Sequence, residues 1–480
     1  MGLAAKGDNG VKAMLRRKYP GAFSRYATVE EATEGCGRTR AEVVATVDGN
    51  VLLMQIPQSV ERFAEYVDVL ANILRAKLRS AAVVVVVFDE PEILTKAKRE
   101  EQHKRDASRS APAKYHSSDI APVPADDDYD GAALRAVRNC HEILASRPAR
   151  SRFYDAIGVE LVRCLGAELA ATAAAQASQA AAGAGGVPPS VVLFDGLDPR
   201  GATRPANAPR NVRIFGAGQD AEAVASALGH DPIGEGDLKL AAIEASVRRV
   251  AARPEAERPT PLRAACVHFA VTIDTDSLAI GLLERARLDV EEPTRGPFQS
   301  ALLMRERAPK RGRDGEEGQA SYLVCDYDAL YLLVQKDLWN VRLSVLRKMD
   351  AVQKRIAMTL TVGGWILAGS DYAEIKGLHA LMTTEAVPGV LQRAPRLLEM
   401  TKAAWSGDVS AARLLLPQVL RRLVDVSVRN YADGPRVKKS TLADLEHYDE
   451  VQLRRAAWCC AYWSGWEIRD DLDEFGFALA

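Results

Sequence analysis

Four continuous apolar runs constrain the fold of this chain more than any other feature of its sequence. They are residues 41–48, 81–89, 190–195 and 267–274. Each run is rich in β-branched residues, and each includes an aspartate at its end. Uninterrupted runs of this kind are typical of strands that are buried on both faces of a parallel sheet. The sequence therefore predicts a central parallel sheet that collects carboxylates at one edge.

Helical patterns lie between these runs. Residues 59–79 place apolar side chains on one face at helical spacing, and residues 151–170 and 236–252 also read as helices. From about residue 340 onward the pattern is helical throughout. Alternating strands and helices predict an α/β fold with a doubly wound, mainly parallel sheet, a helical insertion and a helical C-terminal region. Ligands of such sheets bind outside the carboxyl ends of the strands.

Composition excludes several classes of protein. With 48% apolar and 26% charged residues among 480, the chain has enough apolar material for a packed core. No apolar run is long enough to span a bilayer, so we expect no membrane partner. The 63 basic and 64 acidic residues give a net charge of −1. This excludes a protein that binds nucleic acid through a uniformly basic surface, but it does not exclude a local basic patch. The N-terminus lacks a secretory pattern, and the seven scattered cysteines predict reduced thiols, so we expect an intracellular protein of the cytoplasm or nucleus.

Seven acidic residues stand at the ends of apolar runs or at helix starts. They are Asp48, Asp89, Glu235, Asp237, Asp274, Asp276 and Asp371. Clustered carboxylates provide the hard oxygen ligands that Mg²⁺ and Mn²⁺ prefer. Two such ions about 3.5–4 Å apart can drive in-line hydrolysis of a phosphodiester. The sequence therefore predicts a two-metal site, which we expect to hold two Mg²⁺ or Mn²⁺ ions.

Each of these acids also has a purely structural explanation. A single Asp after a strand is commonly a turn or cap residue, and Glu235 at a helix start would interact well with the helix dipole. Asp195 and Asp198 are treated as incidental acids of that kind. Only the whole set favours a metal site.

The acidic motifs resemble those of the 5′-nuclease superfamily, which comprises flap endonucleases and Xrn-type 5′→3′ exoribonucleases with a PIN-like fold. The resemblance is carried by VDGN (47–50), VFDEPEILTKAKREEQHKR (87–105), GHDPIGEGDLK (229–239), IDTDSLAIGL (273–282) and GSDYAEIKGLHAL (369–381). It covers about half of the chain, and the length is nearest to that of compact flap nucleases or large-DNA-virus relatives, for which a viral factory is a further compartment. The third motif is closer to the Xrn type and the last is closer to the flap-nuclease type.

The resemblance implies roles for individual residues. All seven acids match metal-site positions of the family. Lys96, seven residues after Asp89, matches the basic residue that contacts the scissile phosphate. The family's next basic position is His103 here, and the adjacent Lys104 and Arg105 are candidate substitutes.

The resemblance also implies an organisation and an activity. Residues 1–105 would form an N-terminal nuclease half with a basic gateway helix, and 106–190 a mobile loop and helical insertion. Residues 191–381 would form the second nuclease half with a candidate helix–hairpin–helix, followed by a helical region at 382–480. The implied activity is metal-dependent 5′→3′ hydrolysis of single-stranded or flapped nucleic acid with a 5′ end. DNA and RNA both remain open as substrates, as do exonuclease and flap-endonuclease action, and protein partners are unspecified.

Two other readings compete with this one. VRIFGAGQDA (212–221) fits the glycine pattern of a dinucleotide-binding oxidoreductase, but no second acid-ended strand follows at the expected distance. The other reading is a non-catalytic nucleic-acid-binding or structural relative with the same fold.

Overall fold

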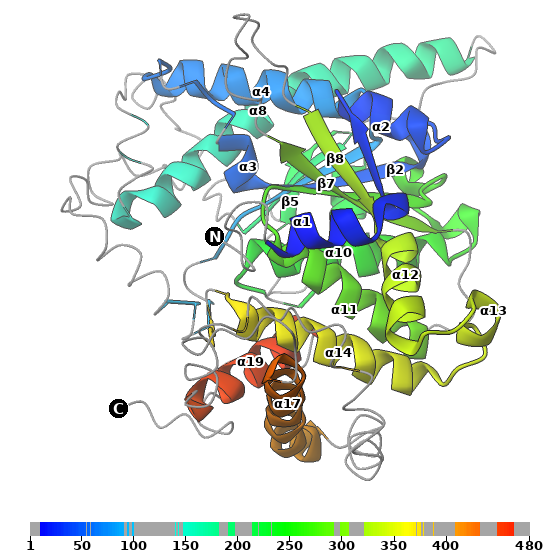
Figure 1. Ribbon diagram of the computed structural model, residues 1–480. Helices are drawn as coiled ribbons and strands as arrows, with labels where there is room; N and C mark the ends of the chain where they lie inside the picture. The colour runs from blue at the N-terminus through cyan, green and yellow to red at the C-terminus, as the bar shows by residue number, and fades with distance from the viewer. Residues whose placement is uncertain are drawn as a thin grey trace, which may run out of the picture.

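A sheet of eight strands lies between two layers of helices, and a further helical layer packs beneath one of them (Figure 1). This computed structural model describes residues 10–53, 55–57, 59–90, 94–95, 98–99, 140, 143, 147–181, 191–196, 214–218, 220–231, 233–291, 298–306, 321–370, 372–375, 378, 387, 409–432 and 449–464. The predicted α/β class is confirmed.

The sheet is mostly parallel, with antiparallel strands at its two sides. Its strands are β1 (Phe23–Tyr26), β2 (Val43–Asp48), β3 (Val83–Val87), β4 (Val191–Asp195), β5 (Ile214–Ala217), β6 (Val267–Thr272), β7 (Gln299–Glu306) and β8 (Ser321–Asp326). The order is β1-β8-β7-β6-β2-β3-β4-β5, and the five central strands β7, β6, β2, β3 and β4 are parallel. The four predicted runs form β2, β3, β4 and β6, so this part of the prediction is confirmed.

Antiparallel pairing places β8 beside β7, β1 beside β8, and β5 beside β4. None of the four strands β1, β5, β7 and β8 follows from the apolar runs. β1 is four residues long and half exposed, and β8 begins with partly exposed residues. Short or partly exposed strands lack the continuous apolar signal of a buried parallel strand.

Helices cover both faces of the sheet. One face carries α2 (Val29–Gly35), α3 (Gly49–Leu53), α4 (Phe63–Leu78) and α8 (Arg147–Ala181). The other carries α1 (Val11–Lys18), α9 (Ala221–Ala227), α10 (Gly236–Ala251), α11 (Asp276–Glu291) and α12 (Tyr327–Trp339). Alternate residues of β3 face opposite layers: Val84 and Val86 join the α4 side, and Val85 joins the α10 side. The doubly wound arrangement thus follows from strands that are apolar at every position.

The predicted helices are present with shifted ends. α4 begins at Phe63, four residues after the predicted start, while α8 extends the predicted 151–170 in both directions. α10 spans nearly the whole predicted range of 236–252.

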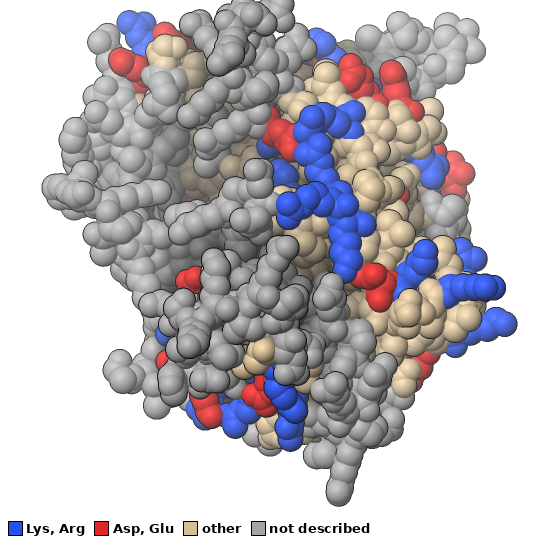
Figure 2. All heavy atoms as spheres, in the orientation of Figure 1, with Lys and Arg blue, Asp and Glu red and all other residues tan. Residues whose placement is uncertain are grey.

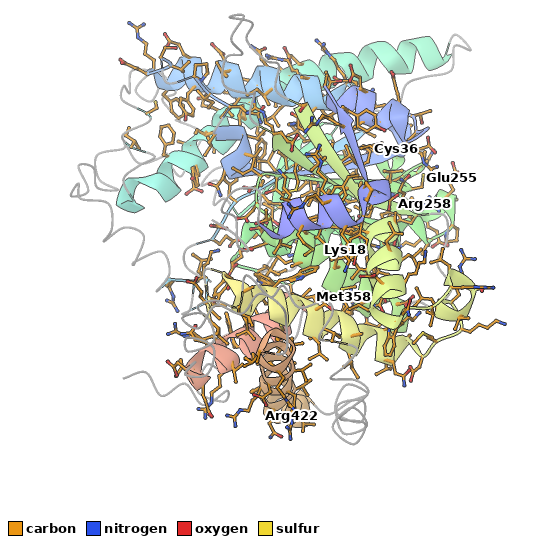
Figure 3. All side chains as sticks on the ribbon, in the orientation of Figure 1. Lys18, Cys36, Glu255, Arg258, Met358 and Arg422 are labelled. Carbon is orange, nitrogen blue, oxygen red and sulfur yellow. The ribbon has the colours of Figure 1, made fainter. Side chains whose placement is uncertain are left out.

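The third layer consists of α13 (Leu343–Leu346), α14 (Ala351–Ala368), α17 (Val409–Ala432) and α19 (Glu450–Trp463). α14 packs against α11 on one side and against α17 and α19 on the other, and Figure 3 places Met358 on α14 and Arg422 on α17. Because α14 is enclosed on both sides, its residues are buried from Lys354 to Ala368. Trp458 and Trp463 of α19 are buried in this layer.

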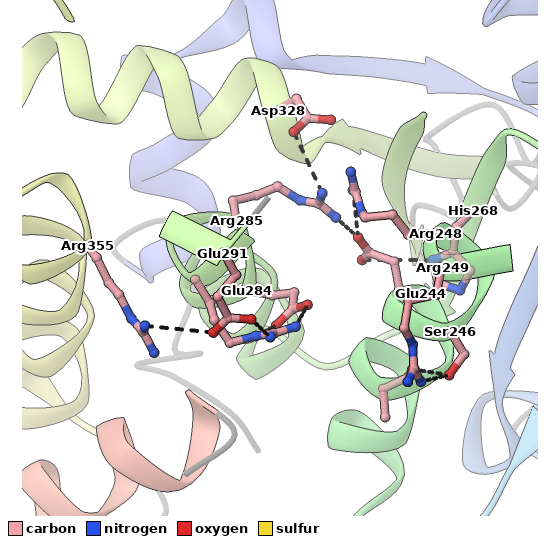
Figure 4. Close-up of polar contacts among 12 residues, drawn as sticks. Glu244, Ser246, Arg248, Arg249, His268, Glu284, Arg285, Glu291, Asp328 and Arg355 are labelled. Atoms are coloured by element: carbon pink, nitrogen blue, oxygen red, sulfur yellow. Dashed lines mark hydrogen bonds and ion pairs between the residues drawn. The ribbon is translucent and has the colours of Figure 1, made fainter. Parts of the chain in front are cut away.

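Buried ion pairs connect the helices on the α10 side (Figure 4). Glu244 of α10 pairs with Arg285 of α11, and both side chains are almost completely buried. Arg285 also lies 3.8 Å from Asp328 of α12, and Arg248 lies 3.4 Å from Glu244. These contacts lock α10 and α11 side by side, which matters because both helices begin at the acidic edge of the sheet.

Several predicted features fall outside the described residues. They are the mobile loop predicted at the start of 106–190 and residues 182–190 at the end of that region. Strands from the predicted regions 1–105 and 191–381 join in a single sheet. In the part of the chain that is described, no helix combines the length and apolarity needed to cross a membrane.

Candidate metal site at the carboxyl edge of the sheet

The winding of the sheet reverses between β2 and β6. From β2 the chain reaches β3 on one side through α4, and α10 leads to β6 on the other side across the opposite face. A reversal of this kind opens a crevice at the carboxyl ends of the two strands, where ligands of doubly wound proteins bind. Asp48 ends β2 and Asp274 follows β6, so the topology places both acids beside this crevice.

Hydrogen bonds tie the ends of β2 and β6 together. The Asn50 amide donates to Oδ1 of Asp48 at 2.9 Å, and the Thr272 hydroxyl donates to Oδ2 at 3.2 Å. The Thr272 hydroxyl in turn accepts the amide of Asp274 at 3.0 Å. Asp48 is only 8% exposed, so its carboxylate is fixed in a largely dry position.

The starts of α10 and α11 supply three more acids. Glu235 is the N-cap residue of α10, Asp237 lies in its first turn, and Asp276 is the first residue of α11. Ser277 Oγ donates to Oδ1 of Asp237 at 2.7 Å, and the Asp276 amide donates to Oδ1 of Asp274 at 3.2 Å. The positive ends of two helix dipoles therefore face the cluster and favour negative charge there.

Asp89 brings the end of β3 into the same group. Its Oδ1 accepts the amide of Gly236 at 2.8 Å, which caps the start of α10. Six of the seven predicted acids thus converge from four segments of the chain. The seventh, Asp371, lies outside the described residues.

Mutual repulsion and burial act on the carboxylates. Burial raises the pKa of Asp48 to about 7, and the charges of Asp89 and Asp274 add to this effect. Burial also raises the pKa of Asp237 well above its ordinary value, again with a contribution from Asp274. A cluster that resists full ionisation in this way attracts a cation.

Lys98 is the described cation closest to the acids, and the sequence did not single it out. Its Nζ lies 3.5 Å from Oε2 of Glu235 and 5.7 Å from the ring centre of Tyr372. Burial lowers the pKa of Lys98, but the charges of Glu235 and Asp89 outweigh burial and hold it above its ordinary value. Lys96, His103, Lys104 and Arg105, the predicted basic residues of the gateway, lie outside the described residues.

Two tyrosines close the site on the Glu235 side. The Tyr372 hydroxyl lies 3.1 Å from both carboxylate oxygens of Glu235, and burial together with the charge of Glu235 raises the pKa of Tyr462 on α19. The ring of Tyr372 packs edge-on against Trp463, with centroids 6.1 Å apart. The C-terminal helical layer therefore forms one wall of the site, a role that no local sequence pattern predicts.

The donor set fits a divalent cation by its chemistry. The described residues contain no group of three His, Cys, Asp or Glu side chains arranged to hold a metal ion. Mg²⁺, however, is usually held by one or two carboxylates and keeps several waters, so it does not require such a cage. Among the described residues the six acids outnumber Lys98, the lysine that pairs with Glu235, and a bound cation would neutralise the charge that they carry.

No protein-family model and no curated protein matches this chain in sequence.

Proposed function

We propose that the chain is a metal-dependent 5′→3′ nuclease of the 5′-nuclease superfamily, with a PIN-like fold. One observation carries the proposal: six buried or half-buried acids from β2, β3, α10, β6 and α11 converge at the switch point of the sheet, with Lys98 beside them. Their order along the chain is that of the motifs that resemble the family.

Each residue of the proposed site would have a distinct role in binding the metal ions or the phosphate. Asp48, Asp89, Asp237 and Asp274 would hold two Mg²⁺ or Mn²⁺ ions together with Glu235 and Asp276. When bound, such ions activate water and neutralise charge on a phosphodiester. Lys98 would place a fixed positive charge beside the reacting phosphate, where it stabilises the charge that develops in the transition state. Tyr372 holds the Glu235 carboxylate in place through its hydroxyl.

A basic surface favours a nucleic-acid substrate. Figure 2 shows a band of Lys and Arg side chains across the face of the molecule on which α1 lies. α1 contributes Lys12, Arg16, Arg17 and Lys18, and Arg25 of β1 adds to them. Glu306 lies within 4 Å of three of these cations, Lys12, Arg16 and Arg25, so the band keeps a positive excess. Such a surface attracts a phosphate backbone, and we expect substrate binding to weaken as salt rises.

The test uses purified protein with Mg²⁺ and four labelled substrates of matched sequence. They are 5′-phosphorylated single-stranded RNA, the same strand as DNA, a DNA duplex with a 5′ flap, and a blunt duplex. Loss of mononucleotides from the RNA would support Xrn-type exonuclease action, and one cut near the flap junction would support flap cleavage. Metal-dependent cleavage of none of them would overturn the nuclease and favour a non-catalytic nucleic-acid-binding relative.

Two substitutions test which residues form the proposed metal site. We expect Asp237→Ala and Asp274→Ala to abolish cleavage, a loss of about 10³-fold or more, because each removes a carboxylate from the charge cluster. Binding of the same substrate, measured by fluorescence anisotropy in Ca²⁺, should change little. Asp68→Ala serves as a matched control, because Asp68 is exposed on α4 on the opposite face of the sheet. Turnover in Asp237→Ala equal to that of Asp68→Ala would remove Asp237 from the site.

A further inference from the structure

A second buried network of ionisable groups lies directly behind the acidic site. Nζ of Lys239 lies 2.6 Å from Oε1 of Glu90 and 3.2 Å from Oδ1 of Asp195. The other oxygen of Asp195 lies 2.7 Å from Nε2 of His230. Nδ1 of His230 lies 2.7 Å from the carbonyl oxygen of Asp231. Glu90, Lys239, Asp195 and His230 therefore form one continuous ladder, and we refer to it as the Lys239 ladder.

The ladder pairs its ionisable groups in a buried position. The side chain of Lys239 is fully buried, and those of Glu90 and Asp195 are nearly so. Burial raises the pKa of Asp195, but Lys239 and His230 outweigh it and hold that pKa below its ordinary value. Asp195 in turn raises the pKa of His230 against the effect of burial. Lys239 therefore lies between two carboxylates in a dry interior, where an unpaired charge would be very costly.

The backbone is shaped around Lys239. Gly196 follows β4 with φ +89°, a conformation that residues with a side chain rarely adopt. A Cβ atom at this position would lie 2.5 Å from Nζ of Lys239 and 2.3 Å from the carbonyl oxygen of Phe88. The chain thus passes the ammonium group at a distance that only glycine permits.

The ladder joins the two segments that carry three of the proposed metal ligands. Glu90 is the neighbour of Asp89, and its amide donates to the carbonyl of Gly234 at 2.8 Å. Lys239 lies one turn into α10, where its amide donates to the carbonyl of Glu235 at 3.1 Å. The Lys239–Glu90 ion pair therefore clamps the end of β3 against the start of α10.

We propose that Lys239 is a positioning residue for the acidic site, with Asp195 and His230 as its anchor on β4. It holds the end of β3 and the first turn of α10 in a fixed relative position, so that Asp89, Glu235 and Asp237 all face the proposed metal site. This role rests on the proposed metal-dependent function. Lys239 is not a catalytic residue, because its buried ammonium group cannot touch a substrate.

The experiment compares Lys239→Met with Lys354→Met in the full-length protein. Lys354 is the matched control: it is also buried, and its Nζ lies 2.5 Å from Oδ2 of Asp289 in the packing of α14 against α11. Binding of Mn²⁺ is measured directly by calorimetry, and amide hydrogen exchange is followed at Glu90 and Gly236. Cleavage of the best substrate is recorded as a function of Mn²⁺ concentration.

We expect Lys239→Met to weaken Mn²⁺ binding about tenfold or more, as loss of a supporting contact does in known metal sites. Exchange at the Glu90 and Gly236 amides should accelerate, and cleavage should need correspondingly more Mn²⁺. Lys354→Met should lower the melting temperature while leaving both Mn²⁺ affinity and these two amides unchanged. Unchanged affinity and unchanged protection at Glu90 and Gly236 in folded Lys239→Met would overturn the positioning role.

Two further outcomes remain informative. If Lys239→Met fails to fold, His230→Gln at the outer end of the ladder replaces it, with a several-fold loss of Mn²⁺ affinity expected and an unchanged affinity counting against the proposal. If the wild-type protein binds no Mn²⁺ and cleaves nothing, the proposed function fails. The exchange data then report whether the ladder still orders the junction of β3 and α10.

Discussion

His268 shows how burial decides the charge of a single residue. Its ring is fully buried in β6, and Nε2 lies 2.9 Å from Oγ1 of Thr46 on β2. Burial lowers the pKa of His268 to about 3. Oε2 of Glu244 lies 3.9 Å from Nδ1, but Glu244 is engaged by Arg285 and Arg248, so its charge is not available to stabilise an imidazolium.

This pKa predicts a loss of stability in acid. An unfolded histidine has a pKa near 6.5, so between about pH 6.5 and 3 the unfolded chain binds a proton that the folded chain does not. Stability therefore falls as pH decreases through this window, by up to about 1.4 kcal/mol per pH unit. In His268→Gln, which can still bond to Thr46, the decline in the free energy of unfolding from pH 7 to 5 should be smaller by about 2 kcal/mol. Urea unfolding at both pH values measures it, and parallel declines in the two proteins would contradict a neutral buried His268.

The convergence of the six described acids could be predicted from the sequence, because each one stands at or just after the end of a strand or at the start of a helix. Their partners could not. The Tyr372 hydroxyl reaches Glu235 across 137 positions of sequence, and no local pattern encodes such a contact. Lys98 lies two residues after the basic residue that the family motif indicates, and only the folded chain shows which lysine approaches Glu235. Asp195 ends a strand like the other acids, yet its partner is Lys239 and its role is that of an internal counter-charge.

At the scale of elements, burial explains which strands could be predicted. β2, β3, β4 and β6 are buried at every position, so each leaves a continuous apolar run in the sequence. β7 and β8 pair antiparallel near the side of the sheet, and each has partly exposed ends that interrupt the pattern. Their place in the sheet follows from contacts with distant segments, which a single-sequence pattern does not contain.

The contact between α11 and α12 depends on a glycine. A Cβ atom at Gly281 would lie 2.2 Å from the ring of Tyr327, whose hydroxyl donates to the carbonyl of Ser277 at 2.7 Å. Gly281→Ala must therefore displace Tyr327 and disturb the first turn of α11. We expect it to lower the free energy of unfolding by about 1–3 kcal/mol. Urea unfolding measures this cost.

Gly236→Ala is the control at the start of α10. Its Cβ would meet Oδ1 of Asp89 at 3.4 Å, an ordinary contact, and the helical backbone there accepts alanine. We expect its free energy of unfolding to stay within about 1 kcal/mol of the wild type. Equal effects of the two substitutions would show that packing on Tyr327 does not decide the outcome at Gly281.

At the scale of the whole molecule, the C-terminal layer and the sheet share one hydrophobic core. A continuous set of buried side chains runs from Val85 of β3 through α10, α11 and α14 to Trp458 of α19. Because Tyr372 contacts Glu235 and packs against Trp458 and Trp463 of α19, the same layer contributes to the candidate site. The helical region is therefore expected to unfold together with the sheet and not as an independent domain.

Trp365 tests this cooperativity. Its side chain is fully buried, and it belongs to α14, the helix that packs against α11 on one side and against α17 and α19 on the other. Trp365→Ala should lower the free energy of unfolding by about 3–5 kcal/mol. The substitution leaves a cavity in the layer of α14, and the surrounding side chains can fill it only in part. In calorimetry the variant should melt earlier but still in one transition, with the van't Hoff enthalpy equal to the calorimetric enthalpy. A split into two transitions, with the sheet unfolding at the wild-type temperature, would show that the C-terminal layer is a separate unit and that the site survives its loss.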